Sequence, residues 1–167
     1  MNKIEKETFM KRLLTFALAT LVITSTAAAF GADNSLGTWK LNAEKSKYSP
    51  GPLPVKNITS VREAAADGVK VINTGERSDG TTINATYTAK YDGSPASVSG
   101  QGAPYDTVTL KQVNANKFSY EAKNGTTKYQ AHGEIEVSRD GKTMTFKVKG
   151  TNQDGKPMSS ELVYEKQ

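Results

Sequence analysis

The sequence of 167 residues contains no cysteine, one histidine and one tryptophan. Without cysteine the chain can form no disulfide bond, offer no thiolate nucleophile and carry no thiol-linked lipid anchor. A single histidine excludes a zinc site built from several histidines of one chain. We therefore expect neither a bound metal nor a cofactor. The sequence also lacks a Gly-x-Ser-x-Gly motif, which would present a serine nucleophile.

Extended apolar stretches are scarce, and the clearest one lies near the N-terminus at residues 13–23. Residues 10–12 before it read Met-Lys-Arg, and mostly small residues follow at 24–32. This pattern is typical of a secretory signal peptide, and the stretch is too short for a membrane helix of about 20 residues. We expect residues 1–31 to be an N-terminal extension and signal peptide. The mature protein would then be periplasmic or secreted, with no stable membrane insertion after cleavage.

The chain is basic, with 22 lysines and arginines against 17 acidic residues. Residues 1–31 carry four of the basic and two of the acidic residues, which leaves 18 and 15 in residues 32–167 and a net charge of +3 there. The basic residues form no run of five or six, so we expect no nucleic-acid partner. The remaining 136 residues are enough to bury one core. We expect residues 32–167 to form one monomeric domain.

Six dipeptides in this domain are typical of tight turns between antiparallel strands, because Asn-Gly and Asp-Gly tolerate positive φ angles. They are Asp67-Gly68, Asp79-Gly80, Asp92-Gly93, Asn124-Gly125, Asp140-Gly141 and Asp154-Gly155. Residues 114–116, Asn-Ala-Asn, are a further candidate turn. The spacing of these turns predicts a series of hairpins.

Apolar and polar residues alternate between the turns with a period of two, which indicates strands with one buried face. The pattern predicts nine strands, at about 36–42, 56–64, 69–77, 81–91, 106–113, 117–123, 126–138, 142–152 and 156–166. In the second of these, residues 62–66 leave a short helical turn as an alternative. We predict an all-β fold, a single antiparallel up-and-down barrel of eight or nine strands, because closure hides both sheet edges. A two-sheet β-sandwich is the alternative.

The first expected strand carries Gly37-Thr38-Trp39, and residues 45–52 read Lys-Ser-Lys-Tyr-Ser-Pro-Gly-Pro. The Gly-x-Trp motif resembles the opening of lipocalins and related calycin barrels. The longer string resembles uncharacterised bacterial exported proteins with a lipocalin-like domain, over residues 36–167. The resemblance implies that Gly37 and Trp39 form the closed end of the barrel. No arginine near the C-terminus is placed to cover the Trp39 indole, so Lys40 and Lys166 are the candidates.

Five tyrosines fall on the expected apolar faces: Tyr87, Tyr91, Tyr120, Tyr129 and Tyr164. A dry core favours leucine and isoleucine, since a buried hydroxyl needs a hydrogen-bond partner. Alanines and glycines beside the tyrosines leave space between them. We predict that Tyr87, Tyr120, Tyr129 and Phe146 line a shared ligand pocket. The alternative is that the small residues permit close strand packing and the hydroxyls reach the barrel mouth.

These patterns favour an exported lipocalin-like protein that binds a small apolar or amphipathic ligand without catalysis. One alternative is a cell-envelope interaction or maintenance protein with a filled barrel. A third hypothesis is an isomerase or cyclase that acts by positioning its substrate. The single histidine of the chain, His132, falls on the side of a strand that is expected to face solvent. The sequence shows no group of residues arranged for catalysis. The prolines and lysines of residues 43–56 could form either a lid over the cavity or a cover for a sheet edge.

Overall fold

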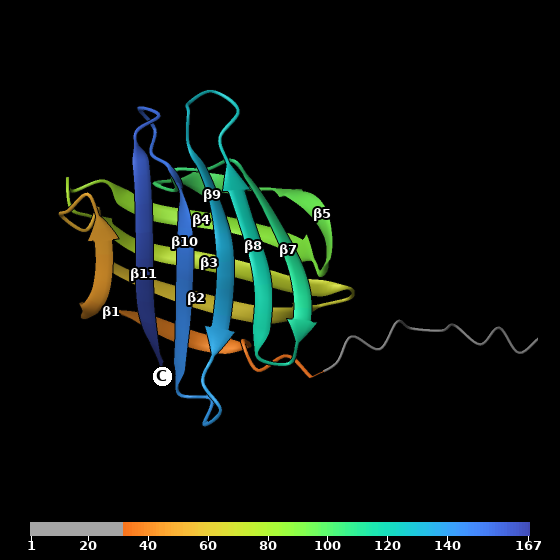
Figure 1. The fold of residues 1–167 in the computed structure, drawn as a ribbon. Helices are drawn as coiled ribbons and strands as arrows, with labels where there is room; N and C mark the ends of the chain where they lie inside the picture. Colours follow the sequence, from red (N-terminus) through yellow and green to blue (C-terminus); the bar gives the residue numbers. More distant parts are fainter. Residues whose placement is uncertain (1–31) are drawn as a thin grey trace, which may run out of the picture.

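The computed structural model describes residues 32–167, and the signal peptide expected over residues 1–31 lies outside the described residues. The described chain is all-β, and it contains no helix that could span a membrane. Its strands form one antiparallel sheet of 11 strands that curls into a nearly closed barrel. In Figure 1, β7–β11 lie in front and cross β2–β4 behind them.

The strands follow one another along the chain with short connections. Their bounds are β1 Gly37–Ser49, β2 Val55–Ala65, β3 Gly68–Arg77, β4 Thr82–Lys90, β5 Asp92–Ser97, β6 Ser99–Gln101, β7 Thr107–Asn114, β8 Lys117–Lys123, β9 Gln130–Val137, β10 Thr143–Thr151 and β11 Pro157–Lys166. Their order across the sheet is β5-β7-β8-β9-β10-β11-β1-β2-β3-β4-β6. The first strand therefore pairs with the last one as well as with β2.

The predicted number of eight or nine strands is wrong, because β5 and β6 arise from residues 92–101, where no strand was expected. This segment contains Pro95, three glycine or aspartate residues that disfavour strands, and only a short alternation at Ala96 and Val98, so its own sequence favours a strand weakly. Its β5 half pairs with β7 and its β6 half pairs with β4, which are the two ends of the remaining sheet. Backbone N–H and C=O groups at those ends would otherwise be unpaired, and they pair with this segment. The segment therefore connects the two ends of the sheet across the gap in the barrel.

Close approach of β6 to β4 depends on a glycine. Gly100 has a φ of 97°, and a Cβ atom at that position would lie 2.0 Å from the Asn84 carbonyl oxygen. Other residues rarely adopt this backbone conformation, and their side chain would force the two strands apart. Gly100 therefore permits the pairing that joins this end of the sheet.

Of the expectations about the first two strands, the end of the first is corrected and the second, a strand over residues 56–64, is confirmed. β1 extends to Ser49, beyond the predicted end at residue 42, through an irregularity between Asn42 and Lys47. The Ser46 hydroxyl donates to the Asn42 carbonyl at 2.7 Å and accepts from the Val163 amide at 2.9 Å, so it stands in for the missing ladder contact. Only residues 50–54 connect β1 to β2, and residues 62–65 belong to β2 instead of forming a helical turn.

Five of the six turn dipeptides lie where two paired strands of adjacent sequence meet, and residues 114–116 join β7 to β8 in the same way. The exception is Asp92-Gly93, which begins β5, a strand that does not pair with β4. The chain changes direction there without forming a hairpin.

Candidate functional site

One end of the barrel is closed around Trp39, whose side chain is fully buried. The indole Nε1 donates a hydrogen bond to the carbonyl of Ser35 at 2.8 Å, and Ser35 is also fully buried. The Lys166 ammonium lies 5.1 Å from the centre of the indole ring. Gly37 leaves room for this lysine, because a Cβ at position 37 would lie 3.0 Å from Lys166 Cε. Of the two candidate lysines, Lys166 therefore covers the indole.

The other end of the barrel holds a cavity of about 350 Å³. Its inner wall comes from β1–β4, β8, β10 and β11, and its outer rim comes from residues 54, 102–105, 129 and 152–154. The β8–β9 and β10–β11 connections rise at the top of the barrel in Figure 1, and the C-terminus lies at the opposite end. Those two connections are hydrogen-bonded to each other, since the Lys128 amide donates to the Gln153 carbonyl at 3.2 Å.

Aromatic rings form a continuous wall on one side of this cavity. Tyr105 lies between Tyr129 and Tyr120, with ring centres 6.1 and 6.5 Å apart. Tyr120 packs its ring edge to face with Phe146 at 5.8 Å, and Phe146 contacts Tyr164 at 5.5 Å. Rings held in such a chain present a broad apolar surface with several hydroxyl groups.

All four residues that the sequence analysis assigned to a shared pocket lie in the wall of this one cavity: Tyr87, Tyr120, Tyr129 and Phe146. Tyr105, Tyr48 and Arg62 also line it, and the sequence analysis did not assign them to the pocket. Tyr48 and Tyr105 lie at or beyond the expected strand ends, where no alternation marks them as inward-facing.

The small residues divide into two groups. Ala85 on β4 lines the cavity, with 1% of its surface exposed. Ala131 on β9 is also buried, at 3% exposed, but it lies among the packed core residues and not in the cavity wall. Of these two alanines, only Ala85 leaves space for a ligand.

The hydroxyl groups in the cavity lie in surroundings that disfavour ionisation. Burial raises the pKa of Tyr129 to about 12, with a smaller contribution from Tyr48. Burial likewise raises the pKa of Tyr105 and Tyr120 well above the ordinary value near 10, and neighbouring tyrosines add to the effect. The tyrosines of the wall are therefore neutral hydrogen-bonding groups at physiological pH.

Strand pairing fixes the depth of each residue on the wall formed by β2, β3 and β4. Below Val55 and Arg77, which pair at the rim, one row contains Ile58, Gly75 and Ile83, and the next row contains Ser60, Asn73 and Ala85. The innermost row that lines the cavity contains Arg62, Val71 and Tyr87. Polar groups on this wall thus reach from the middle of the cavity to its inner end.

Among residues 32–167, Arg62 is the one charged residue that is buried, with 2% of its surface exposed. Its Nε atom donates to the Ser35 hydroxyl at 3.1 Å. That hydroxyl donates to the Asp33 carboxylate at 2.6 Å, and Asp33 also accepts a hydrogen bond from the Tyr91 hydroxyl. The network ties the N-terminal residues to the closed end and holds Arg62 in place from one side.

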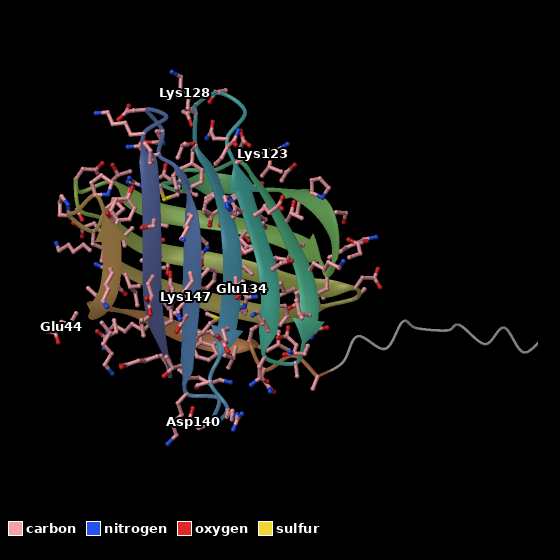
Figure 2. The ribbon with its side chains drawn as sticks, in the orientation of Figure 1. Glu44, Lys123, Lys128, Glu134, Asp140 and Lys147 are labelled. Atoms are coloured by element: carbon pink, nitrogen blue, oxygen red, sulfur yellow. The ribbon has the colours of Figure 1, made fainter. Side chains whose placement is uncertain are left out.

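The outer face of the barrel carries charged side chains, as Figure 2 shows for Glu134 on β9 and Lys147 on β10. Glu134 pairs with Lys117 at 2.8 Å, and both carboxylate and ammonium remain partly in solvent. His132 is exposed on the same face. Residues 32–167 contain no cluster of histidines and carboxylates that could hold a metal ion.

Comparison with known proteins gives little further guidance. No protein-family model matches the chain, and no curated protein is similar enough in sequence to match. One similar solved structure is that of EF1p2_mFAP2b bound to DFHBI, with 11% identity and a TM-score of 0.44. The similarity covers 80% of this chain and 94% of that one. A similarity this loose assigns neither a family nor a function.

Proposed function

We propose that this protein binds a small apolar or amphipathic molecule inside the barrel and does not transform it. The observation that carries the proposal is the cavity of about 350 Å³ with an aromatic wall. Ligand pockets of proteins begin at roughly 300 Å³, and most combine apolar walls with a few polar groups. The alternative of an envelope protein with a filled barrel needs an interior without such a space.

Two observations support a role in binding rather than catalysis. Among the residues of the cavity wall, the single carboxylate is Asp154, and it lies in an exposed connection at the rim. His132 lies on the outer face, away from the cavity. General acid–base catalysis needs titratable groups that converge on the substrate with a pKa near the working pH. The groups that converge in this cavity are mainly tyrosines, and burial raises the pKa of Tyr105, Tyr120 and Tyr129. We further propose, from the sequence pattern of residues 10–32, that the protein acts in the periplasm or outside the cell.

A pair of matched substitutions tests the binding function with N-phenylnaphthylamine, a neutral probe that fluoresces in apolar sites. Ala85→Leu adds three carbon atoms inside the cavity. We expect it to weaken probe binding by about tenfold or more, while stability changes by only about 1 kcal/mol, because the new side chain is buried in existing space. Ala131→Leu makes the same chemical change in the packed core and should cost about 1–3 kcal/mol.

The outcomes separate the two functions. Probe uptake by the wild-type protein that is lost in Ala85→Leu, with the fold retained, supports binding in the cavity. Failure of the wild-type protein to take up the probe at micromolar concentrations contradicts the proposal. Equal binding by Ala85→Leu and wild type would also contradict it, because the probe would then occupy another place.

A further inference from the structure

The guanidinium of Arg62 is only partly satisfied. Its Nε atom reaches Ser35, but Nη1 and Nη2 are buried and neither has a hydrogen-bond partner within residues 32–167. No carboxylate of the described chain forms an ion pair with it, since Asp33 contacts it only through the Ser35 hydroxyl. Buried charges in proteins are normally paired, because leaving one unpaired is costly.

Arg77, the other arginine of the cavity wall, has both a hydrogen-bond partner and a nearby carboxylate, as charged side chains usually do. Its Nη1 donates to the Gly102 carbonyl at 3.4 Å, and its Nε lies 3.8 Å from a carboxylate oxygen of Asp79. Arg77 lies on β3 near the rim, so solvent also screens its charge. The unpaired charge of the cavity is therefore the one at its inner end.

Arg62 lines the inner end of the cavity, but protein atoms cover both Nη groups, so a ligand reaches them only when a neighbouring side chain such as Tyr87 moves aside. Arg62 lies in the innermost row of the cavity wall with Tyr87, and Ser35 occupies the Nε side toward the closed end. Tyr87 and Tyr164, two residues of the cavity wall, are close enough to feel the charge. Burial raises the pKa of both hydroxyls, and the positive charge of Arg62 partly opposes that rise. At Tyr87 a side-chain contact with Arg62 also lowers the pKa, although this contact lacks the geometry of a full hydrogen bond.

We propose that Arg62 binds the anionic head of the ligand, so that the cavity selects small organic acids with an apolar body. This proposal rests on the binding function proposed above and adds the chemical class of the ligand. The two Nη groups can donate in parallel to the two oxygens of a carboxylate or to a sulfonate. The apolar body would then lie along the aromatic wall from Phe146 to Tyr105, with its far end toward the rim.

The test compares two probes with the same aromatic body. Anilinonaphthalene sulfonate carries an anionic group, whereas N-phenylnaphthylamine does not. We expect wild-type protein to bind the sulfonate about ten- to hundredfold more tightly than the neutral probe, the range for a hydrogen bond to a charged group. This comparison on the unaltered protein needs no variant to fold.

Substitutions then locate the preference. Arg62→Met removes the charge and keeps an apolar side chain of similar length, so the two probes should bind with affinities within about threefold of each other. Arg62→Lys keeps the charge but not the paired donors, and it should retain part of the preference. Arg139→Met makes the same charge change at an exposed position outside the cavity and should leave the preference intact.

Three results would overturn the assignment while leaving the binding function standing. The first is equal affinity of wild-type protein for both probes, as expected if ordered water satisfies the guanidinium. The second is an unchanged preference in Arg62→Met. The third is loss of the preference in Arg77→Met and not in Arg62→Met, which would place the anion at the rim. If neither probe binds to the wild-type protein, the result contradicts the proposed binding function itself.

Discussion

Replacing Trp39 by phenylalanine tests whether the closed end anchors the barrel. The substitution keeps an aromatic ring, but it removes the indole N–H that donates to the Ser35 carbonyl at 2.8 Å. Both residues are fully buried, so water cannot replace the lost donor. An unsatisfied buried carbonyl costs about 1–3 kcal/mol. Besides the nitrogen, the ring loses two carbons, which add about 1.6 kcal/mol at about 0.8 kcal/mol for each buried carbon.

The two contributions sum to about 3–5 kcal/mol, a large part of the roughly 5–15 kcal/mol that stabilises a typical domain. With a urea m-value of about 2 kcal/mol/M, the unfolding midpoint should fall by on the order of 2 M. Because Trp39 is the only tryptophan, unfolding of the variant is followed by far-UV circular dichroism instead of indole fluorescence. An unchanged m-value would show that the same surface is exposed on unfolding.

Lys166→Met is the matched control for this experiment. It removes the ammonium above the ring, which lies 5.1 Å from the ring centre, but keeps most of the apolar stem. Lys166 is exposed, so we expect a cost of about 0.5–1 kcal/mol. A midpoint for Trp39→Phe that is within about 0.5 M of wild type would refute the role of the indole hydrogen bond. Equal effects of the two substitutions would show that the cation, not burial, carries the stabilisation.

Two more predictions concern the sheet and the tyrosines. Gly133→Ala should lower the free energy of unfolding by about 1–3 kcal/mol, because its Cβ would lie 1.9 Å from the Lys147 carbonyl oxygen on β10. Gly125→Ala, whose Cβ first meets Asp106 Oδ2 at 3.4 Å, should change it by no more than about 0.5 kcal/mol in the same urea titration. Stability should also fall as the pH rises above about 10, because unfolded tyrosines ionise there while burial raises the pKa of Tyr129 in the fold to about 12. Urea midpoints measured on either side of that pH check this, and a midpoint that stays constant would contradict the burial of the hydroxyls.

The sequence by itself determined most of the local structure. Asn-Gly and Asp-Gly pairs favour turns, and five of the six lie at hairpin connections, although Gly68 and Gly125 do not adopt the positive φ that motivated the prediction. Period-two alternation identifies the buried face of a strand, and it predicts inward positions for Tyr87, Tyr120, Tyr129 and Phe146, all of which line the cavity. The signal peptide and the export of the protein stay predictions, because residues 1–31 lie outside the described structure.

The tertiary structure alone decided what depends on contacts between distant strands. Residues 92–101 become β5 and β6 because the ends of the sheet need partners, not because of their own sequence. Alternation says that a side chain points inward but not how deep in the barrel it lies, since depth depends on the register of neighbouring strands. For this reason Ala85 lines the cavity whereas Ala131 packs in the core.

Arg62 shows most clearly the difference between what the sequence determines and what only the tertiary structure decides. It follows Ile58 and Ser60 at intervals of two, so the pattern already contained a charged residue on an inward face of β2. A charge at such a position contradicts the usual rule for a core, and the adjacent alanines left a helical turn open as an alternative to the strand. Only the pairing of β2 with β1 and β3 places the guanidinium between Ser35 and the cavity. Whether a buried charge is paired depends on residues far away in the chain, and the folded structure alone brings them together.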